Sequence, residues 1–181
     1  VQVDSSTDAQ RVIDDLDGGV DTLVVDTRLE LDPEIIEDSA TLRFDAGLGI
    51  ARALTQLVVQ RTPSNSEITI LGDHEVSHRT ESLLESHGCT VSVWPIPDGT
   101  PSTSLRVVLE GTDVLLGFSK KEGTIDEDVI DAVPDSSLLI DAGVRSFTES
   151  AIEYADDHGY DLFRSDTRAG YITEIECATI T

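Results

Sequence analysis

The chain has 181 residues, of which 39% are apolar and 4% aromatic, and its 36 acidic and 12 basic residues give a net charge of −24. This length suits one ordinary core, and the spread of apolar residues through the chain excludes bulk disorder. The charge excludes a basic nucleic-acid footprint, and the lack of a run of about 18 apolar residues excludes a membrane-spanning helix, so we expect a cytoplasmic protein.

The first 62 residues predict a small N-terminal α/β segment. A short strand at residues 1–3 is followed by a helix at about 8–16 and by a buried strand at 22–26. The stretch 29–44 is expected to hold a short helix that begins near Asp32-Pro33-Glu34, and then a crossing segment. Apolar residues at three-and-four spacing predict an amphipathic helix over 47–60.

After the turn at residues 62–66, short apolar runs alternate with helical periods, which is typical of parallel strands joined by crossover helices. The predicted strands cover 68–71, 90–94, 113–117, 138–141 and 161–164, and the predicted helices cover 76–87, 126–133 and 147–158. Prolines make the connection 95–106 irregular, and the sequence leaves open an additional strand at 105–109. The tail 170–180 favours a helix over an edge strand.

The acidic excess favours adaptation to molar salt, where screening removes the repulsion between carboxylates. The carboxylates are scattered along the chain, and Lys120 and Lys121 are the only lysines. A surface that mimics nucleic acid and a cation-binding surface are the alternatives, and the sequence does not separate clustered from scattered charge. Cys89 and Cys177 are far apart and lack ligand spacing, so we expect buried thiols and no metal site.

Residues 68–144 resemble the NAD(P)-binding half of the methylene-tetrahydrofolate, methylene-tetrahydromethanopterin and shikimate dehydrogenases. The strand 68–71 with Gly72, the helix that follows and the strand 90–93 are similar to the first strand, phosphate turn, helix and second strand of such a domain. The runs 112–117 and 138–144 resemble later strands of that domain. The resemblance implies a Rossmann-like region over 63–181, although one compact domain overall stays open. The acidic composition indicates a haloarchaeal-type protein.

The sequence therefore predicts a doubly wound α/β fold, with a mostly parallel Rossmann-like sheet and helices on both faces. The resemblance implies NAD(P) as cofactor, but of the three glycines of a dinucleotide turn only Gly72 remains. Trp94 and Pro95 stand where an acidic residue usually receives the ribose hydroxyls. The catalytic lysine of these dehydrogenases has no counterpart in the first 60 residues.

Residues at the predicted carboxyl ends of three strands are the candidates for binding a nucleotide or a small anionic ligand. They are Gly72, Asp73, His74, Ser77, His78 and Arg79, then Ser119, Lys120 and Lys121, and then Asp141, Gly143 and Arg145. Asp166, Arg168 and Gly170 would extend the cleft. Each group also has a plain explanation as a solvated turn, a surface loop or an Asp-Arg pair.

Three functions stay open. The first is an NAD(P)-dependent dehydrogenase-like protein with unassigned chemistry. The second is a non-catalytic ligand-sensing or assembly subunit that has lost the dinucleotide-binding glycines. The third is a nucleic-acid mimic. The sequence also leaves a homo-oligomer open.

Overall fold

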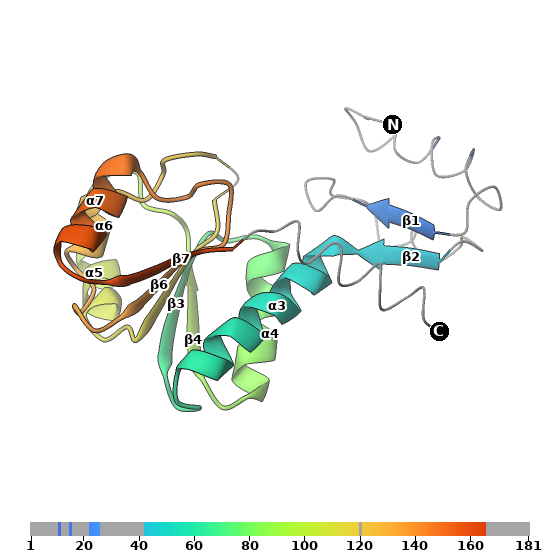
Figure 1. Cartoon of the computed structure of the whole chain (residues 1–181), viewed down its shortest axis with the longest axis horizontal. Coiled ribbons are helices and arrows are strands. Elements are labelled where there is room, and N and C mark those ends of the chain that lie inside the picture. Colours follow the sequence, from blue (N-terminus) through green and yellow to red (C-terminus); the bar gives the residue numbers. More distant parts are fainter. Residues whose placement is uncertain (1–10, 12–14, 16–21, 26–41, 120, 166–181) are drawn as a thin grey trace.

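The computed structural model describes residues 11, 15, 22–25, 42–119 and 121–165. It has a two-stranded parallel sheet, made by β1 (Thr22–Val25) and β2 (Leu42–Asp45), and a five-stranded sheet. Helix α3 (Ala46–Arg61) follows β2 directly, so that the smaller sheet lies at the start of this helix, and the helix itself packs along the larger sheet (Figure 1).

The five strands of the larger sheet all run parallel. They are β3 (Glu67–Leu71), β4 (Thr90–Trp94), β5 (Val114–Gly117), β6 (Leu138–Asp141) and β7 (Asp161–Arg164), and they stand in the order β4-β3-β5-β6-β7. β5 and β6 are buried at every position, because both their faces are covered.

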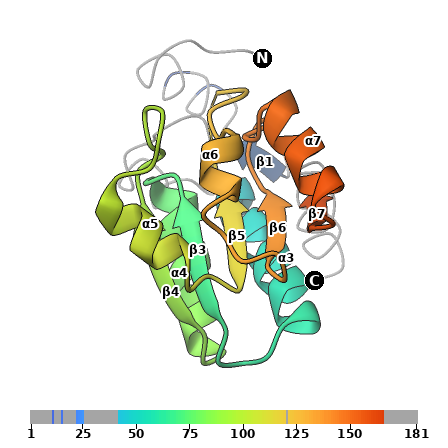
Figure 2. The same cartoon turned by 90° about the vertical axis from the view of Figure 1, so that its left-hand side faces the viewer.

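Helices cover both faces of this sheet, as the doubly wound fold requires. On one face α3 packs with α4 (Glu75–Ser86), and Leu54, Val58 and Leu84 join the inner residues of the strands in one core cluster. On the other face lie α5 (Thr103–Leu109), α6 (Glu127–Ile130) and α7 (Glu149–Asp157), which share a second cluster (Figures 1 and 2). The predicted fold class is confirmed.

Two elements differ from the sequence prediction. The segment 105–109, left open as a strand, belongs to helix α5: Ser102 accepts a hydrogen bond from the Leu105 N–H, and Leu105 and Leu109 are buried one turn apart. The crossing segment expected before residue 44 ends in strand β2, which pairs with β1 from Thr22↔Leu42 to Val25↔Asp45.

The remaining predicted elements either agree with the structure within a few residues or fall outside the described residues. The predicted helix 126–133 is confirmed only over the shorter α6. The strand at 1–3, the short helix near residue 32 and the tail 170–180 lie outside the described residues, and of the helix 8–16 only Arg11 and Asp15 are described, both helical. The division of the chain after residue 62 stays a prediction; α3, which precedes it, packs on the larger sheet.

Candidate functional site

The candidate residues lie at the carboxyl edge of the five-stranded sheet. Along the chain the sheet begins at β3, continues to β4 on one side, and then crosses to β5, β6 and β7 on the other side. The strand order therefore reverses between β3 and β5. In open α/β sheets the loops at such a reversal diverge and form the usual ligand-binding crevice.

Gly72 ends β3 in a backbone conformation that only glycine adopts readily. Its φ is +127°, and a Cβ atom here would lie 2.0 Å from the Phe118 carbonyl oxygen. The Gly72 N–H donates to the Trp94 carbonyl, and the Phe118 N–H donates to the Leu71 carbonyl. Gly72 thus lets the loops after β3 and β5 touch at the point where the strand order reverses.

The start of α4 keeps part of a dinucleotide turn. In the spacing G-x-G-x-x-G, the first glycine makes the tight turn, the second allows the pyrophosphate to approach, and the third allows the helix to pack closely on the strand. These positions hold Gly72, His74 and Ser77. Ser77 is completely buried, so a small side chain still serves the third role. The second position, which would face the pyrophosphate, has changed most, because His74 replaces glycine there.

His74 is the N-cap residue of α4, but its side chain makes no cap hydrogen bond. Its ring stands edge-on to Phe118, with the centroids 5.5 Å apart, and its Nδ1 lies 3.4 Å from Ser77 Oγ. By contrast, Ser102, Asp126 and Thr148 each cap the helix that follows them. Among helices α4 to α7, only α4 therefore begins without a side-chain cap.

The acidic residues of this turn are paired with basic residues of α4. His78 Nε2 lies 2.8 Å from Asp73 Oδ1, and His78 Nδ1 lies 2.9 Å from Glu81 Oε2. The hydrogen bond with Glu81, followed by that with Asp73, raises the pKa of His78 above its usual value. Arg79 pairs with Glu75 in the same way. His78 and Arg79 thus reduce the repulsion that Asp73 and Glu75 would exert on a bound phosphate.

The loops after β5 and β6 are joined by a buried serine that the sequence did not single out. The Ser146 hydroxyl donates to the Gly117 carbonyl and accepts from the Ser119 N–H. Gly143 packs so closely on Ser119 that a Cβ atom would lie 2.4 Å from the Ser119 nitrogen. No sequence motif marks Ser146 as a structural residue, so this role is seen only in the folded structure.

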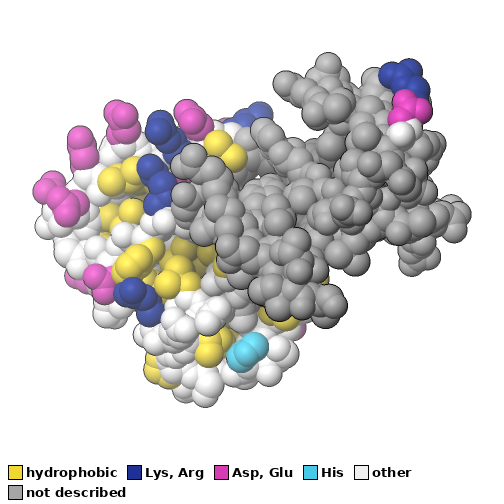
Figure 3. Space-filling view, turned by 45° about the vertical axis from the view of Figure 1, so that its right-hand side comes forward, with side chains coloured by type: hydrophobic (Ala, Val, Ile, Leu, Met, Phe, Trp, Pro, Cys, Tyr) yellow, Lys and Arg dark blue, Asp and Glu magenta, His cyan; other side chains and the backbone are white. Residues whose placement is uncertain are grey.

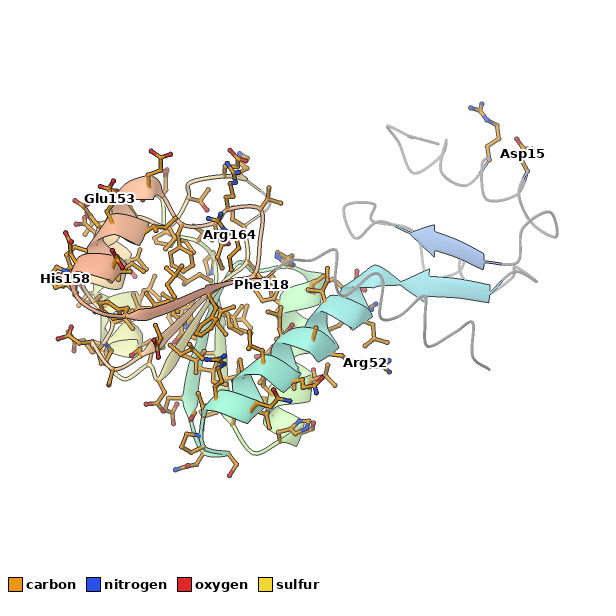
Figure 4. All side chains as sticks on the ribbon, in the orientation of Figure 1. Asp15, Arg52, Phe118, Glu153, His158 and Arg164 are labelled. Atoms are coloured by element: carbon orange, nitrogen blue, oxygen red, sulfur yellow. The ribbon has the colours of Figure 1, made fainter. Side chains whose placement is uncertain are left out.

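The Asp141 carboxylate positions these loops by hydrogen bonds. It is 1% exposed; its Oδ1 accepts from the Ser146 N–H, and its Oδ2 lies 3.3 Å from Arg164 Nε. Figure 4 labels Phe118, which follows β5, and Arg164, which ends β7. Both carboxylate oxygens of Asp141 are therefore occupied, and its side chain positions the loop.

Lys121 and Arg145 are the exposed cations of these loops. The Arg145 carbonyl accepts from the Gly123 N–H, so the two loops lie side by side, and Lys121 is anchored by the Ser119 hydroxyl, which accepts from its N–H. Arg145 has a φ of 51°, a strained value for a residue with a side chain. Neither side chain makes an ion pair within the part of the chain that the structure describes. Lys120, Asp166, Arg168 and Gly170 lie outside it.

The described part of the chain has a cavity at the opposite edge of the sheet. This open cavity of about 600 Å³ is lined by Arg61, Asn65, Asp113, Asp135, Ser137 and Asp161, with other residues at the amino ends of the strands. Several of its polar groups are already bonded: Asp113 accepts from the Glu67 N–H, and the Ser137 hydroxyl donates to the Thr112 carbonyl. We therefore place the candidate site at the carboxyl edge, on the strength of strand order and loop geometry.

The described residues hold no group of three or more His, Cys, Asp or Glu side chains arranged to bind a metal ion. None of their helices is long and apolar enough to cross a membrane.

The comparisons with known proteins identify the fold. No protein-family model matches the chain, and no curated protein sequence does either. Among solved structures, the methylenetetrahydrofolate dehydrogenase-cyclohydrolase of Trypanosoma brucei, solved with NADP and an inhibitor, is similar at a TM-score of 0.62 and 11% identity, over 98% of this chain and 75% of that one.

Two other structures are similar over 88% of this chain. They are a dipicolinate synthase chain of Bacillus halodurans, at a TM-score of 0.57 and 12% identity, and the silkworm 5,10-methylenetetrahydrofolate dehydrogenase, at 0.56 and 15%. The chain spans 65% of the length of each. At these identities the likeness shows the fold alone, which is an α/β Rossmann-like fold.

Proposed function

We propose that the protein binds a nucleotide, with NAD(P) the first candidate, at the carboxyl edge of its five-stranded sheet, as a dehydrogenase-like protein whose reaction is unassigned. The observation that carries this proposal is the uncapped start of α4 at the point where the strand order reverses. The first N–H groups of a helix point at a ligand and favour a negative charge there.

The loops after β5 and β6 would supply the rest of the site. Lys121 and Arg145 lie on two loops that are bonded to each other, and neither is committed to an ion pair with a described residue. A phosphate or carboxylate between them and α4 would be held by charge-assisted hydrogen bonds. The structures that resemble this chain include one that was solved with NADP, which supports the choice of cofactor.

The single tryptophan gives a direct test. Trp94 ends β4, and its carbonyl bonds to Gly72, so a nucleotide beside Gly72 would lie near the indole. We would titrate NADPH, NADH and their oxidised forms in molar KCl and follow the tryptophan fluorescence, with free tryptophan as the inner-filter control. We expect saturable quenching by one of them.

Variants then locate the site. Arg145→Ala and Lys121→Ala should each weaken binding roughly tenfold, because each removes a charged hydrogen bond to the ligand. Arg61→Ala is the matched control, since Arg61 lies at the amino edge of the sheet and should leave binding unchanged. Equal losses in all three variants would count against the carboxyl edge, and the absence of any saturable response, checked by calorimetry, would reject the nucleotide.

A specific observation favours the second function, a non-catalytic ligand-sensing or assembly subunit. His74 replaces the glycine that would face the pyrophosphate, and its ring packs against Phe118. If the titration fails for every nucleotide, this function takes first place. His74→Gly would then be expected to restore some nucleotide affinity, because it reopens the approach to the helix.

We also propose that the protein works in a cytoplasm of high salt. The net charge of −24 supports this. On the face shown in Figure 3, the Asp and Glu side chains of the described residues lie in separate groups, whereas a nucleic-acid mimic would gather them on one surface.

A further inference from the structure

Strand β4 forms one edge of the five-stranded sheet and, among the strands that the structure describes, pairs with β3 alone. The Thr90 N–H donates to the Ser66 carbonyl, and the Trp94 carbonyl accepts from the Gly72 N–H. Thr90 and Trp94 thus turn their backbone groups toward β3. Because the backbone alternates along a strand, Ser92 does the same, while Val91 and Val93 turn theirs outward.

The outward N–H and C=O groups of β4 belong to Val91 and Val93. Within the part of the chain that the structure describes, no residue bonds to these groups. Pro95 holds the next outward position and has no N–H, so it ends the pairing edge immediately after the strand. Such an open edge is a template for a further strand.

The residues of β4 suit a second copy of this chain as that strand. In molar salt the charges of two chains of net charge −24 repel only within about 3 Å, so the chains associate best where no like charges touch. β4 is Thr-Val-Ser-Val-Trp and carries no charge at all. Proteins usually protect an open edge with a lysine, an inward charge or a proline inside the strand, and β4 has none of these.

We propose that the protein forms a two-fold dimer in which β4 pairs antiparallel with β4 of a second copy, about an axis through Ser92. In this register Val91 of each copy lies opposite Val93 of the other, and the two valine pairs form four hydrogen bonds that satisfy every outward group. Ser92 meets its own copy, and Thr90 meets Trp94, so every facing pair is uncharged. The two sheets become one sheet of ten strands.

The side chains fit this register as well. Val91 and Val93 face the α3 and α4 layer, in which they are partly buried, while Trp94 packs on the opposite core cluster. A two-fold axis perpendicular to the sheet keeps the same face on the same side in both copies. The valines would therefore pair with valines, and both cores would continue across the interface.

The test uses the full chain in molar KCl. Sedimentation equilibrium over a concentration series should give a dimer. Val93→Pro removes only an outward N–H and leaves the bonds between β3 and β4 in place, because proline is tolerated on an edge strand. It should raise the dissociation constant of the dimer at least about tenfold, since each dimer loses two hydrogen bonds. Val93→Ala keeps the N–H and should remain a dimer.

Three results would overturn the proposal: a monomer at every concentration, a Val93→Pro dimer as tight as the original, or rapid exchange of the Val91 and Val93 amide hydrogens in a concentrated sample. The exchange measurement needs no variant, so it decides the question even if Val93→Pro fails to fold. None of these results depends on nucleotide binding.

Discussion

At the residue scale, Gly72 is the position where the fold tolerates least change. Gly72→Ala would force an alanine to a φ of +127° and place its Cβ 2.0 Å from the Phe118 carbonyl oxygen. Strain of this kind costs on the order of 1–3 kcal/mol, and the clash with backbone adds to it. We expect urea unfolding in molar KCl to show a loss of about 3 kcal/mol or more.

Gly99 provides the matched control for this substitution. Its φ is +86°, but nothing lies within 4 Å of the Cβ that an alanine would add. Gly99→Ala should therefore cost only the conformational strain, about 1 kcal/mol. Equal losses in the two variants would show that contact between the loops after β3 and β5 is not what fixes Gly72.

His78 gives a second prediction at this scale, because two carboxylates contact its ring. Its pKa is raised first by Glu81 and then by Asp73, so Glu81→Gln should lower the pKa more than Asp73→Asn, in NMR titrations at one KCl concentration. A raised pKa means that the folded state holds the proton more tightly than the unfolded state. The small contribution to stability is thus complete below pH about 6.5 and disappears as the pH rises through the folded pKa. An unchanged pKa in both variants would contradict the pairing.

At the element scale, the loops after β5 and β6 depend on one hydroxyl. Ser146→Ala would leave the buried Ser119 N–H and Gly117 carbonyl without this partner, which should cost about 2 kcal/mol of unfolding free energy. Ser150→Ala is the control, since the Ser150 hydroxyl is exposed and contacts only that of Thr148. Because Ser146 also shapes the loop that carries Arg145, the same variant should weaken ligand binding. Equal stability of the two variants would remove Ser146 from this role.

The elements that the sequence predicted correctly are those whose pattern is local. The strands β4, β6 and β7 and the helix α4 were placed within one residue, because apolar runs and turn residues mark their ends. Helix α5 was missed because Val107 and Val108 are typical of strands. The helix buries Leu105 and Leu109, which lie one turn apart, and this burial depends on the sheet on which the helix packs. Strand β2 was missed because its residues, Leu-Arg-Phe-Asp, form no continuous apolar run, and they become a strand by pairing with β1.

From the sequence, only the position of the candidate residues at one edge of the sheet could be predicted. Strand order put Gly72, Ser119 and Asp141 at one edge of the sheet, and the structure brings the loops that they begin into contact. The hydrogen-bond and ion-pair partners of each side chain depend on distances in the folded chain. These distances cannot be derived from the spacing of residues in the sequence. Ser77 keeps the packing role of a glycine, Asp141 is occupied by Ser146 and Arg164, and His78 and Arg79 turn to carboxylates of their own turn and helix.

At the scale of the whole molecule, charge should decide stability. The Debye length falls from about 10 Å at 0.1 M salt to about 3 Å at 1 M, so KCl screens the mutual repulsion of a chain with a net charge of −24. We expect the melting temperature to rise by on the order of 10 °C between these concentrations, a few kcal/mol for a domain of this size.

A variant of α7 separates charge screening from other effects of salt. Glu153, Asp156 and Asp157 are exposed toward the carboxyl end of this helix, where no basic residue opposes them and the helix dipole disfavours negative charge. Changing the three to Gln, Asn and Asn should raise the melting temperature in dilute buffer, and the gain should vanish in molar KCl, where the carboxylates are already screened. A gain of the same size at both concentrations would mean that helix propensity rather than repulsion is at work, and a melting temperature of the original chain that is independent of KCl would remove the case for adaptation to salt.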